Sequence, residues 1–155
     1  MTEGIYQTVV SAPGFSIGVR CDEAEIHTIE YLEPRTEVVP SNALAREAAR
    51  QLQAYLADPH FVFTLPLRPS GTAFQRRVRE QLSAIPTHQT RTYGELAKAL
   101  HNAPRAVGQA CGANPFPLFF PSHRVLAAGG GTRMKSSLLA SMRRSASAAL
   151  QPAAR

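Results

Sequence analysis

The chain has 155 residues, a mass of 16.8 kDa and 44% hydrophobic residues, which excludes wholesale disorder and fits one domain or two very small ones. It contains no run of eighteen apolar residues, which excludes a membrane-spanning helix, and the N-terminus has no features of a secretory signal. Two cysteines, Cys21 and Cys111, are too few for a disulfide framework, and we expect both to be buried. Because only His27 lies near Cys21 in the sequence, we expect no metal site. We also expect a cytoplasmic protein, nucleoid-associated if prokaryotic.

The net charge of +6 is divided unequally along the chain. Residues 1–66 carry four arginines and no lysine against nine acidic residues, a net charge of −5. Residues 67–155 carry thirteen Lys and Arg against Glu80 and Glu95, a net charge of +11. This asymmetry predicts an N-terminal scaffold domain, 1–66, and a second domain, 67–155, that faces a polyanion, most commonly DNA or RNA. The alternative is a basic surface that water alone solvates.

The first half predicts a small antiparallel sheet with one helix. A helix follows Pro40, with Ser41 or Asn42 as its N-cap, and ends near Asp58, because its apolar residues recur on one helical face. Runs of β-formers bounded by turn residues predict strands over residues 5–10, 15–19, 25–31 and, after the helix, 61–64. Residues 66–70 are typical of a linker.

The second half changes to helical patterns. Capping-box spacing marks two helix starts, at Thr72 with Gln75 and at Thr92 with Glu95. Asn102 is the expected cap of a third helix, which follows closely enough for a helix-turn-helix. The fold class is therefore α+β: a small antiparallel sheet with a helix, then a helix-turn-helix, winged-helix-like domain. A final helix is expected over residues 138–146, and the tail frays from about 145.

Ser122 and His123 form the candidate catalytic pair. Serine next to histidine suggests a hydrolase, but general-base catalysis needs convergence in space rather than adjacency in sequence. No Gly-x-Ser-x-Gly elbow surrounds Ser122, which disfavours this interpretation further.

Several linked motifs resemble the O6-alkylguanine-DNA alkyltransferase family in order and spacing. The resemblance covers residues 71–126, whereas the acidic first half is similar to that family only in layout. The motifs are GTAFQ at 71–75, IP at 85–86, TRTYGELA at 90–97, RAVG at 105–108, NP at 114–115 and PSHRV at 121–125.

The resemblance implies a protein that lays a helix-turn-helix in the minor groove of double-stranded DNA and flips an alkylated guanine into a pocket. In this family the residue matching Arg105 fills the gap in the base stack, and the residue matching Tyr93 pushes on the neighbouring phosphate. Ala106 and Gly108 match small positions where the recognition helix meets the groove. Asn114 matches a residue that joins two segments of the site.

The same resemblance assigns roles within the last motif. A cysteine stands at the position of Ser122 in the catalytic members and accepts the alkyl group irreversibly, without a cofactor. The histidine matching His123 accepts the thiol proton through water, and a late glutamate orients that histidine. Arg124 of the same motif is counted with the DNA-binding residues.

The chain departs from the family pattern in four places. Serine replaces the acceptor cysteine at Ser122, and a hydroxyl is a far weaker nucleophile than a thiolate. Met142 stands at the position of the orienting glutamate, and Arg79 replaces an aromatic residue. Residues 129–132 stand in place of the family's loop that closes the base pocket, which is shortened here. Alkyltransferase-like proteins, which bind alkylated DNA without repairing it, also lack the cysteine.

The sequence therefore predicts a monomer that recognises O6-alkylguanine in DNA by nucleotide flipping, without alkyl transfer, and that has no membrane partner. One alternative is an active methyltransferase in which Ser122 is an introduced change. Another is a decayed paralogue that binds DNA through its helix-turn-helix with no preference for lesions.

Overall fold

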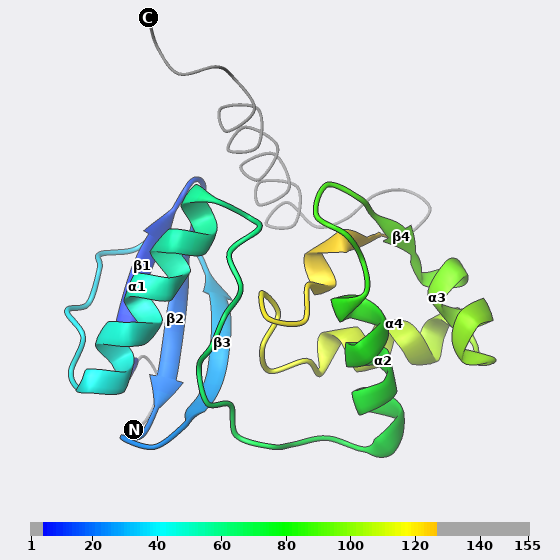
Figure 1. The fold of residues 1–155 in the computed structure, drawn as a ribbon, viewed down its shortest axis with the longest axis horizontal. Helices are drawn as coiled ribbons and strands as arrows, with labels where there is room; N and C mark the ends of the chain where they lie inside the picture. Colours follow the sequence, from blue (N-terminus) through cyan, green and yellow to red (C-terminus); the bar gives the residue numbers. More distant parts are fainter. Residues whose placement is uncertain (1–4, 127–155) are drawn as a thin grey trace, which may run out of the picture.

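The computed structural model describes residues 5–126, and its first three strands form an antiparallel sheet in the order β1-β2-β3 (Figure 1). The strands are β1 (Thr8–Ala12), β2 (Phe15–Cys21) and β3 (Ile26–Leu32). Gly14, with φ 85°, makes the tight turn between β1 and β2, a conformation that glycine adopts at no steric cost. The predicted sheet is confirmed, with β1 beginning slightly later than expected.

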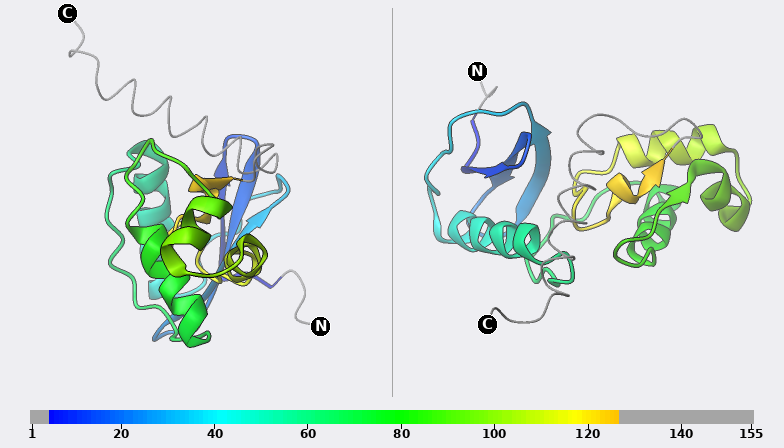
Figure 2. Two further views of the ribbon diagram at one scale, coloured as in Figure 1. Left: turned by 90° about the vertical axis from the view of Figure 1, so that its right-hand side faces the viewer. Right: turned by 90° about the horizontal axis from the view of Figure 1, so that it is seen from above.

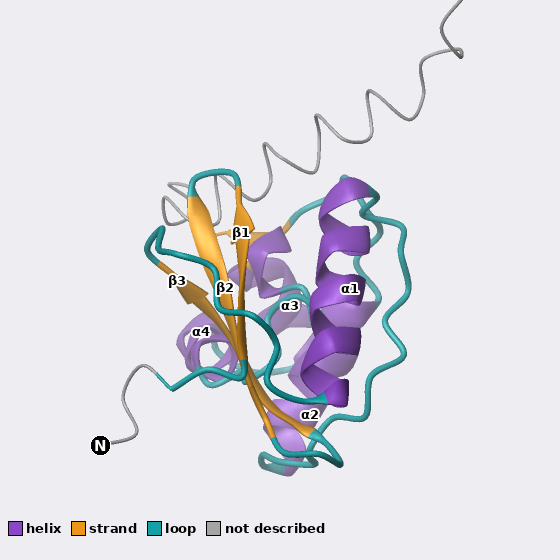
Figure 3. Cartoon of the chain, turned by 90° about the vertical axis from the view of Figure 1, so that its left-hand side faces the viewer, coloured by secondary structure: helices purple, strands orange, loops and turns teal. Residues whose placement is uncertain are grey.

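One helix, α1 (Ala43–Ala57), packs along a single face of this sheet (Figure 3). Asn42 is its N-cap, because the Asn42 side chain accepts a hydrogen bond from the Ala45 amide at 2.7 Å. The apolar face of the helix lies against the strands, and the resulting core includes Phe15, Ile17, Ile26, Ala48 and Leu52. The cap and the end of this helix are as predicted.

The segment at 61–64 is not the strand that the sequence predicts. The Thr64 amide donates to Oε1 of Gln51 at 2.9 Å, so a side chain supplies the hydrogen bond that a neighbouring strand would otherwise provide. The aromatic side chains of the segment pack against other side chains, and its backbone does not pair with a strand among residues 5–126. Phe63 stacks on Phe119 with ring centroids 4.0 Å apart. The aromatic content that suggested a strand therefore serves packing between distant parts of the chain.

The second half is helical and lies beside the sheet unit (Figures 1 and 2). Both predicted capping boxes are present, on Thr72 and on Thr92. The elements in chain order are α2 (Ala73–Ser83), β4 (Arg91–Thr92), α3 (Tyr93–Leu100), α4 (Pro104–Gly112), the 3-10 turn η1 (Ser122–Arg124) and β5 (Val125–Leu126). The α+β fold class is confirmed.

The expected cap of α4 is wrong by one residue. Ala103 is the N-cap and makes no side-chain hydrogen bond, whereas Oδ1 of Asn102 accepts from the Ala103 amide. Pro104 occupies the first turn and has no N–H group to satisfy, which reduces the need for a capping side chain. His101, with φ 54°, ends α3 in the left-handed conformation and turns the chain toward α4.

Two hydrophobic clusters form the core, one under the sheet and one among α2, α3 and α4. Phe116 and Leu118 belong to the first cluster although they follow α4, and Phe120 packs against both. The chain after α4 therefore returns to the sheet unit before it reaches η1. The predicted division at residues 66 and 67 falls in the extended segment between α1 and α2.

Among residues 5–126, no helix combines the length and the apolar character that crossing a membrane requires. The predicted helix at 138–146, the loop at 129–131, the frayed tail and Met142 lie outside the described residues.

Candidate nucleic-acid interface

Ser122 and His123 lie in η1, below the protein surface. Ser122 is 6% exposed and His123 is 0% exposed. The Ser122 amide donates to the carbonyl oxygens of Phe120 at 2.7 Å and Pro117 at 3.2 Å, which fixes the backbone of the turn. A group in bulk water does not meet these side chains directly, so a reacting partner would have to be inserted into the protein.

Asn114 holds the loop that leads into this turn. Its Nδ2 donates to the carbonyl oxygen of Phe120 at 2.8 Å, and its Oδ1 accepts from the Phe116 amide at 2.9 Å. The side chain therefore closes the loop between α4 and η1 through both of its polar atoms.

The structure places Arg124 inside the protein, which does not favour the predicted contact with DNA. Arg124 is 8% exposed, and it donates to the Ile85 carbonyl oxygen at 2.9 Å and to the Tyr55 hydroxyl at 3.1 Å. Burial raises the pKa of Tyr55, and the charge of Arg124 acts in the opposite direction. Arg124 thus links η1 to α1, and its physical role is to anchor the turn.

The other predicted contacts lie on α3 and α4. Arg105 is exposed near the start of α4, while Ala106 and Gly108 are half-buried and Val107, Ala110 and Cys111 face the core. A Cβ atom built on Gly108 meets nothing within 4 Å. The missing side chain of Gly108 is therefore not explained by packing within the described residues, although glycine costs a helix about 1 kcal/mol relative to alanine.

A short parallel strand pair connects this helical surface to the buried turn. Arg91 pairs with Val125 and Thr92 pairs with Leu126, so the residues just before Tyr93 lie beside those just after Arg124. Tyr93 is the first residue of α3, is half-buried and packs against the second core cluster. The predicted residues therefore form two groups, an outer surface on α3 and α4 and a buried turn, which β4 and β5 hold together.

Sequence reasoning missed two contributors to this arrangement, Tyr55 and Phe120. Tyr55 lies on the buried face of α1, and its partner Arg124 lies 69 positions away. Phe120 contributes through its backbone, because its carbonyl oxygen accepts hydrogen bonds from both Asn114 and Ser122. No local pattern marks either role.

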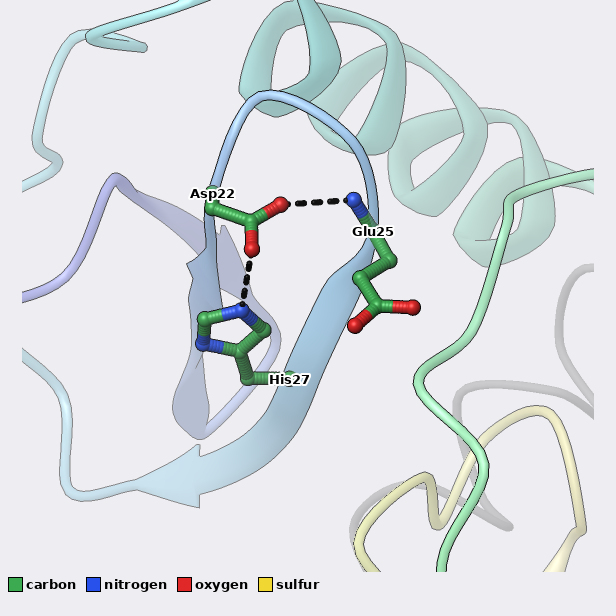
Figure 4. A group of neighbouring side chains, drawn as sticks. All are labelled: Asp22, Glu25 and His27. Carbon is green, nitrogen blue, oxygen red and sulfur yellow. Dashed lines mark hydrogen bonds and ion pairs between the residues drawn. The ribbon is translucent and has the colours of Figure 1, made fainter.

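Asp22, Glu25 and His27 converge where β2 leads into β3, with Oδ2 of Asp22 3.0 Å from Nε2 of His27 (Figure 4). The hydrogen bond with His27, followed by those from the Glu25 and Ala24 amides, lowers the pKa of Asp22. The guanidinium of Arg68 lies on the same cluster, 3.1 Å from Glu25 and 3.6 Å from Asp22. This cation offsets part of the negative charge of the two carboxylates, and the cluster links the segment before α2 to the sheet.

Comparison with known proteins gives consistent matches. The family model of the 6-O-methylguanine DNA methyltransferase DNA-binding domain matches residues 73–148. A methylated-DNA–protein-cysteine methyltransferase of Methanosarcina acetivorans is 37% identical over 134 residues, covering 81% of this chain and 86% of the relative. One from Mycobacterium leprae is 40% identical over 118 residues, covering 70% and 72%. The crystal structure of Mycobacterium tuberculosis OGT in complex with DNA aligns with a TM-score of 0.71 and 31% identity over 88% of this chain and 92% of that one.

Proposed function

Because the chain belongs to the 6-O-methylguanine DNA methyltransferase family, we propose that it binds double-stranded DNA as a monomer and recognises O6-alkylguanine without accepting the alkyl group. The observation that carries the proposal is the pairing of β4 with β5, which joins an exposed helical surface to a buried turn. A nucleotide flipped from DNA held on that surface would have only a short path to the turn.

The surface of α4 supports close approach by a DNA backbone. Arg105 is exposed and has no ion pair among residues 5–126, so its guanidinium is available to a nucleic acid. Gly108 leaves open space on the same helix, where a side chain would hold a partner away. The net charge of +11 over residues 67–155 adds non-specific attraction for phosphates.

The chemistry of the turn supports recognition without transfer. By the family resemblance, Ser122 stands where catalytic members carry the acceptor cysteine. A serine hydroxyl lacks the accessible anionic form of a thiol, and it needs an oriented general base to become a nucleophile. Met142 replaces the glutamate expected to orient His123, so the sequence offers no carboxylate at that position.

The names of the relatives favour a second candidate, an active methyltransferase, since those proteins are described as methyltransferases. The two candidates differ in the fate of the methyl group. Incubation of the chain with a duplex carrying radiolabelled O6-methylguanine should leave the label on the DNA while a complex forms. Stoichiometric label on the protein would establish the second candidate instead.

Arginine variants test the DNA contact separately. Arg105→Ala should weaken binding to a lesion-containing duplex, because an extruded nucleotide leaves a gap that the guanidinium can occupy. Contacts of this kind are worth about 1–3 kcal/mol. Arg46→Ala, an exposed change on α1, is the matched control and should have little effect. Equal losses for the two variants would indicate that Arg105 makes no special contact.

A further inference from the structure

A cavity of about 580 Å³ lies between α2 and the segment that precedes it. This volume is within the range of roughly 300–1,000 Å³ that is usual for small-molecule sites. The walls come from that segment, from α2 and from the loop before η1: Leu67, Arg68, Pro69, Ser70, Arg76, Arg79, Glu80, Ser83, Phe116 and Phe120. The cavity shares Phe116 and Phe120 with the loop before η1, but none of Tyr93, Arg105, Gly108, Ser122 and His123 lines it.

Arg79 is the buried charge of this cavity. The residue is 8% exposed, and its Nη1 donates to the Ser70 carbonyl oxygen at 2.7 Å. Its Nε is buried and has no hydrogen-bond partner among the described residues. A Cβ atom on Gly71 would come within 2.8 Å of Nη2 of Arg79, so the backbone approaches the guanidinium more closely than a residue with a side chain allows.

The charge of Arg79 has no counter-ion among residues 5–126. Arg76, on the same wall, donates to the Gly71 carbonyl oxygen at 2.6 Å and also forms no ion pair there. Arg68 is already paired with Asp22 and Glu25, and Glu80 is the only acidic residue of the lining. Residues 127–155 contain no Asp or Glu that could supply a carboxylate side chain.

Burial without a counter-ion is costly for a cation. Burial lowers the pKa of Arg79, and the neighbouring charge of Arg76 lowers it further. Buried charges in proteins are normally paired, because the loss of hydration is otherwise uncompensated. The positively charged wall, which has no counter-ion among residues 5–126, is therefore complementary to an anion.

Aromatic rings complete the cavity. The Cζ atom of Arg79 lies 5.9 Å from the centroid of the Phe120 ring, and Phe116 lies beside that ring at a centroid distance of 6.4 Å. Arginine pairs well with phosphate, because its donors form a fork that matches phosphate oxygens. An aromatic face accepts a planar ring in a stacked or edge arrangement.

We propose that this cavity binds a small phosphate ester that carries a planar ring, of the size of a nucleoside monophosphate. The phosphate would accept hydrogen bonds from Arg79 and Arg76, and the ring would lie against Phe120. Such a site is separate from the DNA-binding surface and does not depend on the recognition of alkylated guanine.

Calorimetric titration of the full chain with deoxyguanosine 5′-monophosphate tests the proposal, with deoxyguanosine and inorganic phosphate as comparison titrants. The monophosphate should bind about tenfold or more tightly than either, because only it engages both the arginines and the ring. Arg79→Gln should weaken binding about tenfold or more, the loss expected for a charged hydrogen bond. Arg76→Gln, a change at an exposed position, should also weaken binding of the monophosphate.

Arg105→Ala distinguishes this cavity from the DNA-binding surface, and it should leave binding of the monophosphate unchanged. Three results would each overturn the proposal. The monophosphate could fail to bind at millimolar concentrations, or the nucleoside could bind as tightly as the monophosphate. Alternatively, Arg105→Ala could weaken binding of the monophosphate while Arg76→Gln does not. DNA binding by Arg79→Gln, measured in parallel, should stay as in the unmodified chain. If the monophosphate does not bind, the proposed recognition of DNA is unaffected. If the chain does not recognise alkylated DNA, the proposed monophosphate site is likewise unaffected.

Discussion

Asn114 and Ser122 hydrogen-bond to one shared atom, the carbonyl oxygen of Phe120. The Asn114 side chain donates to it at 2.8 Å and the Ser122 amide at 2.7 Å. A side chain just beyond α4 and the first residue of η1 are thus held by the same acceptor. Any shift of the loop changes both bonds, so Asn114 sets the position of the turn that the proposed function depends on.

Asn114→Ala should therefore loosen the turn. It leaves the Phe116 amide without its side-chain acceptor, and removal of a partner from a buried polar group costs about 1–3 kcal/mol. Chemical denaturation should show a lower free energy of unfolding, and preference for a lesion-containing duplex should fall with it. Asn102→Ala is the control, because among residues 5–126 the exposed Asn102 side chain bonds only to the adjacent Ala103 amide. An unfolding midpoint equal for both variants would show that Asn114 does not fix the loop.

Two tyrosines near Arg124 should respond in opposite ways to loss of the hydroxyl. Tyr55→Phe removes a hydrogen bond to a buried guanidinium and should cost about 1.5–3 kcal/mol of unfolding free energy. The Tyr31 hydroxyl is buried with no hydrogen-bond partner among residues 5–126, so Tyr31→Phe should be neutral or stabilising. Thermal unfolding of the two variants measures this difference directly. A destabilised Tyr31→Phe together with an unaffected Tyr55→Phe would contradict the assignment of Arg124 as an anchor.

Gly108→Ala should separate stability from DNA binding. Open space surrounds this position, so alanine should stabilise α4 by about 0.5–1 kcal/mol through helix propensity. The added methyl group should nevertheless weaken DNA binding, because it occupies the space proposed for the DNA backbone. The measurements are thermal unfolding and fluorescence anisotropy with a labelled duplex. Gln109→Ala, on the neighbouring exposed position, is the control, and equal affinities for the two variants would argue against contact at Gly108.

The parts of the fold that the sequence predicted correctly depend on local chemistry. Thr72 and Thr92 cap their helices through residues three positions away, and Asn42 does the same for α1. Such contacts are determined by spacing within one turn of helix, so a sequence pattern is sufficient to find them. The runs of β-formers bounded by turn residues likewise predicted the sheet.

The parts that the sequence did not predict depend on contacts between distant residues. Arg124 was expected on the DNA, but its partners Tyr55 and Ile85 lie 69 and 39 positions away. The segment at 61–64 has the composition of a strand, yet Gln51 and Phe119 provide its contacts. A pattern within a short window carries no information about which distant group satisfies a side chain.

Ser122→Cys should restore little alkyl transfer, although simple loss of the cysteine predicts full rescue. A thiol with a pKa of about 8.5 is mostly protonated at neutral pH and needs an oriented base. His123 is present, but Met142 replaces the glutamate that would orient it. The assay counts label on the protein after incubation with radiolabelled O6-methylguanine in a duplex, and Ser11→Cys, an exposed change, is the control. Stoichiometric labelling of the Ser122→Cys protein within minutes would show that the glutamate is dispensable.

The central claim is that this chain recognises O6-alkylguanine in DNA. The most direct test is the ratio of dissociation constants for two duplexes of identical sequence, one of which carries a single O6-methylguanine, measured at one salt concentration. We expect the lesion-containing duplex to bind more tightly by about tenfold, since a flipped base adds contacts worth about 1–3 kcal/mol. Equal dissociation constants for the two duplexes would contradict the account and would leave a helix-turn-helix protein that binds DNA without regard to alkylation.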